Sequence, residues 1–330
     1  MNSSATYKVI YDTDPGVDDA MALYFALAHP RIEVLGITTT FGNVRVEQAA
    51  LNALYLSAIA GANIPVTQGT EAPVCKPAEA PPAHIHGADG LGNLPARVAT
   101  SNRLDPRSSA QFIVDMARAL PGEITLVAVG PLGNLSRALE IEPRLGQLLR
   151  QVIIMGGTLF EPGNVSEFAE ANIWSDPHAA QQVFNASWAL TMVGLDVTHR
   201  VILPVSLFDT IARTHRHLAT DTLRHAVGFY ADYYSRRHPH VGDIYGCFAH
   251  DVLAFVYLVN PELFSVQTAC IRVVTEGPHQ GQTALMEKDP AADPEFAGDA
   301  HRPPAQVCLQ VQAEDCKRVI ADTLMRPWLG

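Results

Sequence analysis

Residues 8–28 read KVIYDTDPGVDDAMALYFALA, and this stretch decides the fold. Its first part, residues 8–12, is a short apolar run that ends in carboxylates. Its last part, residues 17–28, has the length of a helix and is entered through Pro15, a residue suited to the first turn of a helix. A strand followed at once by a helix predicts the beginning of a βαβ unit.

The same alternation continues along the chain. Apolar or β-branched segments recur, as buried parallel strands require, and helical segments follow them. We therefore predict an α/β fold with a mostly parallel central sheet flanked by helices, a Rossmann-like open sheet with its site at the C-terminal ends of the strands. The further expected strands are residues 32–40, 124–129, 152–155 and 189–195, and the further expected helices are residues 46–60 and the segment after Pro131.

Three longer segments have a different character. Residues 69–107 are rich in Pro, Gly and Ala, which predicts a long loop, and long ordered loops are often functional. Residues 289–304 form a second expected loop, to which no role is assigned. Residues 204–240 are helical in pattern and rich in His, Arg and Tyr, so we expect a helical cap beside the sheet. With no internal repeat or linker, one domain over residues 1–330 is expected.

The composition restricts the partners and the location. The 330 residues include 34 acidic and 23 basic ones, which gives a net charge of −11. This balance argues against a nucleic-acid or anionic-membrane partner, because phosphate binding needs a basic patch. The longest apolar run, residues 20–28, is far shorter than the roughly 20 residues of a membrane-spanning helix. Five cysteines without a C-x-x-C pair are typical of reduced thiols, so we expect buried cysteines and a cytoplasmic protein.

Four carboxylates lie within eight residues, after the first strand and at the start of a helix. They are Asp12, Asp14, Asp18 and Asp19. Because these groups repel one another, something positive should hold them, and an all-oxygen cluster is typical of a hard cation such as Ca²⁺ or Mg²⁺. Helix capping is the alternative interpretation, but it accounts for one or two acids rather than four.

With this motif the chain resembles the inosine–uridine preferring nucleoside hydrolases, whose N-terminal signature is the DTDPGVDD run at residues 12–19. The resemblance covers most of the chain, and the other motifs occur in the family's order and at its approximate spacing. They are GN at 42–43, HIHG at 84–87, LVAVG at 126–130, MGG at 155–157, EPGN at 161–164, AEAN at 169–172 and HD at 250–251.

The resemblance implies a site for Ca²⁺ and for the ribose of a nucleoside. It also implies that Asp14 is the general base and that the protein is a homodimer or homotetramer. The implied Ca²⁺ ligands are Asp14, Asp19, the main-chain carbonyl of Val129, and Asp251. The implied ribose contacts are Asp18, Asn43, Asn164, Glu170, Asn172 and Asp251.

The places of these residues in the chain agree with that implication. Ligands of open α/β sheets bind outside the carboxyl ends of the strands. Four of the implied site residues end or follow different expected strands, namely Asp14, Asn43, Val129 and Asn164. Ordinary turn chemistry is the alternative at residues 42–43, and a solvated loop with a helix cap is the alternative at residues 164–172.

His250 and Asp251 directly precede the strongly apolar residues 252–259. An acid beside such a segment is costly to bury without a partner, which favours a cation ligand at Asp251. His250 is a candidate general acid because imidazole titrates near neutral pH. A lone histidine at the start of an element is often structural, and this alternative stays open.

Tyr230, Tyr234 and His238 have helical spacing and predict a helix face that lines a base pocket, since aromatic rings stack on nucleobases. A stripe that faces the core is the alternative. His86, in the long loop, is a further candidate base contact, or else a solvated histidine. Relatives that hydrolyse purine and pyrimidine nucleosides place a Tyr where His238 falls, so the base preference stays open.

The expected function is metal-dependent hydrolysis of a ribonucleoside to ribose and free base. One alternative is a haloacid-dehalogenase-type phosphohydrolase, with Asp12 as nucleophile, Asp14 as acid and Mg²⁺ as metal. The extra acids at residues 18 and 19 disfavour it, because they would repel a phosphate. The other alternative is a non-catalytic nucleoside-binding protein that keeps the Ca²⁺ site, which a turnover assay would distinguish.

Overall fold

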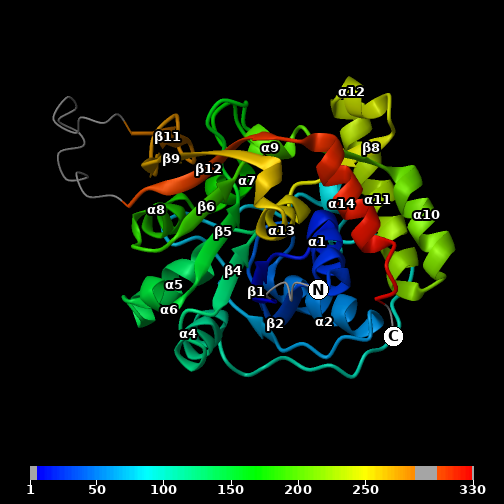
Figure 1. Ribbon diagram of the computed structural model, residues 1–330, viewed down its shortest axis with the longest axis horizontal. Coiled ribbons are helices and arrows are strands. Elements are labelled where there is room, and N and C mark those ends of the chain that lie inside the picture. Colours follow the sequence, from blue (N-terminus) through cyan, green and yellow to red (C-terminus); the bar gives the residue numbers. More distant parts are fainter. Residues whose placement is uncertain (1–5, 287–302, 329–330) are drawn as a thin grey trace.

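Eight strands form the central sheet of the protein (Figure 1). The computed structural model describes residues 6–286 and 303–328. Neighbouring strands of the sheet are parallel, except for the antiparallel pair at one edge, β12 and β9. In spatial order the strands are β3 (Val66–Gln68), β2 (Ile32–Thr39), β1 (Tyr7–Thr13), β4 (Ile124–Ala128), β5 (Gln151–Met155), β6 (Leu190–Val193), β12 (Ala305–Val311) and β9 (Phe264–Ala269).

Helices cover both faces of this sheet, as Figure 1 shows. Each group of helices shares its own hydrophobic core with the sheet. On one face lie α1 (Val17–Ala28), α2 (Val46–Ile59), α13 (Val252–Val259) and α14 (Ala313–Leu324). On the other face lie α4 (Ser109–Ala119), α5 (Gly133–Ile141), α6 (Leu145–Leu148) and α8 (Pro177–Asn185).

The apolar strands alternate between these two cores. In β1, Val9 and Tyr11 pack into the core beside α1, whereas Ile10 packs into the core beside α4. In β4, Val127 packs into the core beside α1, whereas Leu126 packs into the core beside α4. A strand that is buried on both faces needs apolar side chains at every position, which is why these strands are continuous apolar runs.

A helical cap lies beside the sheet, where residues 204–240 were expected to form one. It consists of α10 (Val205–His215), α11 (Leu218–Arg237) and α12 (Pro239–Gly242), and it packs against α1. Two small antiparallel pairs complete the described part: β7 (Ile202–Pro204) with β8 (Gly246–Phe248), and β10 (Ile271–Val273) with β11 (Thr283–Leu285). The short helical segments are α3 (Ala83–His86), α7 (Ala171–Ser175), α9 (Leu195–Thr198) and η1 (Pro261–Leu263).

The predicted elements agree closely with this architecture. Each expected strand and helix is present, and most bounds lie within one or two residues of the expected ones. Residues 69–107 are mainly loop, as predicted, but they include the short helix α3. Of the loop expected at 289–304, residues 289–302 lie outside the described residues. In the described part of the chain, no helix combines the length and the apolar character needed to cross a bilayer.

The expectation that all cysteines are buried was wrong. Cys247, Cys308 and Cys316 are buried, but Cys75 is exposed and Cys270 is half-buried. Cys75 lies in the long loop, and side chains in surface loops have little apolar structure to pack against.

The strand order places the site. β1 is central, and the chain continues to β2 and β3 on one side of it before it crosses to β4 and β5 on the other. The loops that leave β1 and β4 therefore diverge in opposite directions. Such a topological switch point opens a crevice outside the carboxyl ends of these two strands.

Candidate active site

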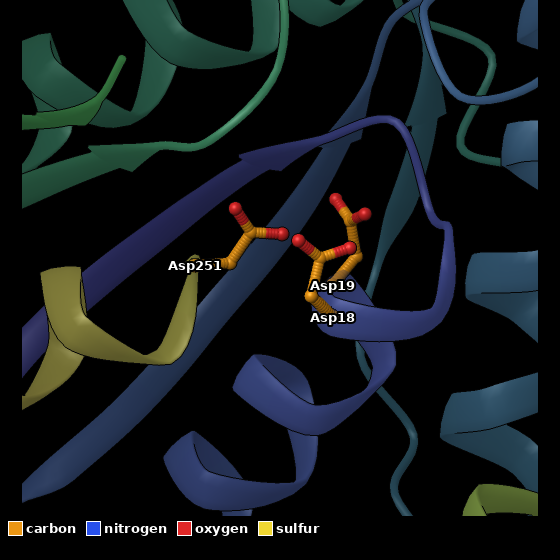
Figure 2. A group of neighbouring side chains, drawn as sticks. All are labelled: Asp18, Asp19 and Asp251. Carbon is orange, nitrogen blue, oxygen red and sulfur yellow. The ribbon is translucent and has the colours of Figure 1, made fainter. Parts of the chain in front are cut away.

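Three acidic side chains converge at this switch point. Asp18 and Asp19 lie in the first turn of α1, and Asp251 directly precedes α13. Figure 2 shows the three carboxylates pointing toward one another from these two helix starts. All three are buried, and one oxygen from each lies within 4.8 Å of the others. The two helix N-termini contribute partial positive charge, but far less than three carboxylates carry.

The Asp19 carboxylate is held by hydrogen bonds from its own loop and from the loop after β2. It accepts one from Thr13 Oγ1, one from Gly16 N at 2.8 Å and one from Asn43 Nδ2 at 2.9 Å. The bond to Gly16 N is the helix-capping interaction that was the alternative interpretation of the acidic motif. Capping therefore explains the position of Asp19, but it does not explain the other acids.

Asp14 and Asp18 each keep one carboxylate oxygen without a partner. Asp14 Oδ2 accepts a hydrogen bond from Asn43 N at 2.6 Å, whereas Asp14 Oδ1 and Asp18 Oδ1 are buried without any hydrogen bond. The backbone approaches Asp14 so closely that a Cβ atom on Gly42 would lie 2.0 Å from Oδ2. Because buried carboxylate oxygens need a donor or a cation, these two orphaned oxygens fit a hard metal ion.

The electrostatics of the cluster lead to the same conclusion. Burial raises the pKa of Asp18 to about 7, and burial together with the neighbouring carboxylates raises the pKa of Asp14 and Asp251 well above the usual range. No Lys or Arg in residues 6–286 or 303–328 forms an ion pair with them. The nearby His86 stays neutral, since burial lowers its pKa to about 3. A bound cation would supply the missing positive charge.

Amide and carboxylate side chains form the neighbouring wall. Asn172 Nδ2 donates to the carbonyl of Val129 at 2.7 Å and to the carbonyl of Met155 at 3.1 Å. Glu170 accepts backbone hydrogen bonds from Asn172 and from Gly157, both at 2.9 Å. The Val129 carbonyl, an implied metal ligand, is thus engaged on one lone pair and keeps a second.

These groups surround a cavity of about 250 Å³. It brings together most of the residues that the sequence singled out, whereas Asp14 lines an adjoining hollow and Asp19 lies behind Asp18 and Asn43. The predicted residues that line the cavity are Asp18, Asn43, His86, Val129, Asn164, Glu170, Asn172, Tyr234, His238, His250 and Asp251.

The cap supplies the opposite wall of the cavity. Tyr230 donates a hydrogen bond to Asp18 at 3.0 Å, and the Tyr234 hydroxyl lies 3.2 Å from His250 Nε2. His250 Nδ1 lies 2.8 Å from Thr198 Oγ1. Tyr230 and Tyr234 are buried in the core, as one interpretation of the aromatic stripe expects, and they also line the cavity; contact with a base stays a prediction.

Two of the histidines that line the cavity, His86 and His250, are held neutral by burial. Burial lowers the pKa of His250 well below its usual range, and neighbouring histidines lower it further. His86 Nδ1 accepts a hydrogen bond from Val17 N at 3.2 Å, which assigns the ring proton to Nε2. His86 thus meets the cavity as a neutral ring with one N–H donor.

Sequence reasoning missed His199 as a lining residue. It lies just after α9, and its Nδ1 is 3.7 Å from Glu161 Oε1. Its ring packs against Phe248 with the ring centroids 4.7 Å apart. The signal that could have found it is its position shortly after the expected strand at residues 189–195, at the same edge of the sheet as the other site residues.

Asp12 does not belong to the cavity. Its carboxylate is fully buried: Oδ2 accepts hydrogen bonds from Thr38 Oγ1 at 2.5 Å and from Asn134 Nδ2 at 2.8 Å, and Oδ1 has no partner. It points to the opposite face of β1 from Tyr11, as alternation along a strand requires. Asp12 is therefore not placed to attack a substrate, which removes the nucleophile that the phosphohydrolase alternative needs.

The open sheet and the acidic cavity at its switch point together define a metal-dependent enzyme of the doubly wound α/β class. The particular family follows from comparison with known sequences. The chain belongs to the inosine-uridine preferring nucleoside hydrolase family, whose model matches residues 9–318. It is thus a hydrolase that acts on N-glycosidic bonds.

Relatives from different organisms match nearly the whole chain. A probable uridine nucleosidase from Arabidopsis thaliana is 36% identical over 320 residues, which cover 96% of this chain and 97% of the relative. A solved plant nucleoside hydrolase has a TM-score of 0.89 at 35% identity, covering 97% of this chain and 99% of its own. The solved purine-preferring ribonucleoside hydrolase of Gardnerella vaginalis has a TM-score of 0.87 at 31% identity, covering 96% and 98%.

Proposed function

We propose that this protein hydrolyses the N-glycosidic bond of ribonucleosides to give ribose and free base, and that the reaction depends on Ca²⁺. The observation that carries the proposal is the pair of orphaned carboxylate oxygens on Asp14 and Asp18, beside a wall of amide and carboxylate groups. The free Asp14 oxygen fits a hard cation, and the free Asp18 oxygen and the wall suit the hydroxyls of a sugar.

The proposed Ca²⁺ ligands are Asp14, Asp19, the carbonyl of Val129, and Asp251. All are oxygen donors, which Ca²⁺ prefers, and no soft Cys or His ligand lies among them. When bound, the ion supplies positive charge that makes water more acidic and attracts the ribose diol.

In the proposed mechanism, Asp14 removes the proton of the attacking water. Burial raises the pKa of Asp14, which makes it a stronger base than an exposed carboxylate. The ribose is oriented by hydrogen bonds that a sugar lacking hydroxyls cannot make. The proposed ribose contacts are Asp18, Asn43, Asn164, Glu170, Asn172 and Asp251.

His250 is the proposed donor of a proton to the departing base. The Tyr234 hydroxyl lies 3.2 Å from His250 Nε2, and burial keeps Tyr234 protonated by raising its pKa. To act as the donor, the ring must first take up a second proton from solvent; it gives this proton to the departing base and returns to the neutral form, while Tyr234 stays protonated and holds the ring in place. The leaving base needs this help because glycosidic cleavage leaves negative charge on it.

The base itself is proposed to contact His86, Tyr234 and His238, which line the cavity. The relatives differ in their bases: one is named for uridine and another for purines. We therefore propose a substrate range of purine and pyrimidine ribonucleosides, without a single preferred base. The cytoplasmic location and the homodimer or homotetramer stay predictions, the latter open to light scattering.

The test is a substrate panel with metal-stripped protein, before and after addition of Ca²⁺ or Mg²⁺. Inosine, adenosine, guanosine, uridine and cytidine are incubated, and the free base is identified by chromatography. The proposal expects ribose and base only after Ca²⁺ is restored. Binding of nucleosides without product would support the non-catalytic alternative, and phosphate release from p-nitrophenyl phosphate would support the phosphohydrolase.

A further inference from the structure

The segment from Thr158 to Glu161 lies between β5 and the part of the cavity wall formed by residues 163–165. It has no strand or α-helix of its own, so its backbone donors need partners elsewhere. The side chain of one residue, Asp196, satisfies most of them. The position of residues 158–161 therefore depends on a contact with a residue that is distant in the sequence.

The Asp196 carboxylate accepts three backbone hydrogen bonds from this segment. Oδ2 accepts from Leu159 N at 2.8 Å, and Oδ1 accepts from Phe160 N at 2.8 Å and from Glu161 N at 3.3 Å. Thr158 Oγ1 adds a longer contact at 3.4 Å. Asp196 is buried, with 3% of its surface exposed, so these are charge-assisted bonds shielded from water.

The backbone on both sides is fitted to this contact. Leu195 N donates to the carbonyl of Gly157 at 2.9 Å, just before the clamped segment. A Cβ atom on Gly194 would lie 2.6 Å from that carbonyl oxygen, so a glycine is required for the close approach. The start of α9 and the start of the segment are therefore in direct contact, and Asp196 extends the contact by three residues.

The same short helix also reaches the other side of the cavity. Thr198 Oγ1 lies 2.8 Å from His250 Nδ1, and His199 Nδ1 lies 3.7 Å from Glu161 Oε1. Side chains from one helical turn thus meet the ribose-side segment and the proposed proton donor. A displacement of this turn would change the distance between the two sides.

We infer that Asp196 is a positioning residue, whose carboxylate fixes residues 158–161 and thereby sets the ribose-side wall at residues 163–165. This inference rests on the proposed function, because it assumes that this wall receives ribose. Asp196 does not line the cavity and touches no substrate in this scheme. Its contribution lies in preorganisation, since a wall misplaced by about 1 Å can cost on the order of a hundredfold in rate.

The substitution that tests this inference is Asp196→Asn. The amide has the size of the carboxylate, but it presents one NH₂ group to the backbone N–H of either Leu159 or Phe160, so at least one 2.8 Å bond is lost. Asp176→Asn is the matched control, because Asp176 is also fully buried and accepts backbone hydrogen bonds from Val74 and Ala179, both at 3.1 Å, outside the cavity.

The experiment measures kcat and KM with p-nitrophenyl riboside, inhibition by ribose, and amide exchange of Leu159 and Phe160. For Asp196→Asn we expect faster exchange at these two amides, ribose inhibition weakened about tenfold and kcat/KM lowered about a hundredfold. The control should keep all three within about twofold. If Asp196→Asn does not fold, Thr158→Val should give the same pattern at about threefold, since it removes the 2.6 Å bond to the Glu161 carbonyl.

Three outcomes would overturn the inference: unchanged exchange at Leu159 and Phe160, fast exchange with unchanged kinetics and ribose inhibition, or an equal loss in Asp176→Asn. Failure of the proposed function is seen separately, because the wild-type protein would then cleave no riboside. In that case the exchange measurement would still show whether Asp196 holds the segment.

Discussion

Replacement of His250 by Ala should slow the release of natural bases and leave an activated leaving group almost unaffected. Hypoxanthine and uracil depart as poor anions and need a proton. A p-nitrophenolate departs readily without one. The variant should therefore separate two substrates that share the same ribose, which is a direct test of a proton donor.

The size of the effect follows from the contacts of the ring. General acids contribute about a hundredfold to ten-thousandfold, or about 2.7 to 5.4 kcal/mol of the barrier. His250 is neutral because burial lowers its pKa, and its Nε2 already has a 3.2 Å contact with Tyr234. Because burial disfavours the charged ring, only a small share of His250 carries the second proton that it can give to the base. We therefore expect the lower end, about a hundredfold.

The assay compares kcat/KM for inosine and uridine with that for p-nitrophenyl riboside, in the same Ca²⁺-containing buffer. His250→Ala should lower the first two about a hundredfold and the third less than threefold. Thr198→Val is the control, because it removes only the 2.8 Å partner of Nδ1. One neutral hydrogen bond is worth about 1 kcal/mol, so this variant should lose about fivefold.

Equal slowing of all three substrates by His250→Ala would refute the assignment, because a positioning role affects every riboside alike. A change in none of them would make the ring structural. The proton donor would then be sought at His238, Tyr234 or His86, which line the same cavity.

Three other predictions concern the acidic cluster and the sugar. Asp19→Ala should abolish Ca²⁺ binding in calorimetry and nearly all turnover while the far-UV circular dichroism is kept; full activity in protein free of divalent metal would contradict the proposal. Deoxyuridine should be cleaved on the order of a thousandfold more slowly than uridine, because it lacks a hydroxyl that the site is built to bind. Metal-free protein should melt at a lower temperature as the pH rises from 6.5 to 8, and Ca²⁺ should weaken this dependence. The sign follows because burial raises the pKa of Asp18 to about 7 and that of Asp14 well above its usual range, so the folded protein keeps protons that the unfolded chain has already released; a melting temperature that rises over this range would contradict it. Part of the dependence remains with Ca²⁺, because burial also raises the pKa of Asp12, outside the cavity, to about 7.

The convergence of Asp14, Asn43 and Val129 at one edge of the sheet could be predicted, because it depends on local sequence and one topological rule. Asp14 and Val129 directly follow β1 and β4, and Asn43 lies in the loop after β2. Parallel strands bring their carboxyl ends to one edge, so residues at these places meet whatever the details of packing. The acidic motif was informative for the same reason, since its members lie on one strand end and one helix start.

The remaining contacts could not be read from the sequence, because they join elements whose separation along the chain is large. Tyr230 and Asp18 are 212 residues apart, and their hydrogen bond depends on how α11 docks on α1. The hydrogen bond from Phe160 N to Asp196 joins residues 36 positions apart, and no periodic pattern in the sequence predicts it. The exposure of Cys75 likewise depends on the course of a loop, which composition does not determine.

The cavity has two different origins, and this has an evolutionary consequence. Its proposed sugar end is made by loops at the strand ends, whereas much of its proposed base end is made by α11 and the residue that follows it. Mutation in the cap can therefore change which base is released while the sugar chemistry stays intact. The Tyr230–Asp18 hydrogen bond joins the cap to the strand-end side of the cavity, and we call this contact the seam. A chimaera that takes residues 205–242 from a relative should inherit that relative's base preference, provided that this seam is kept.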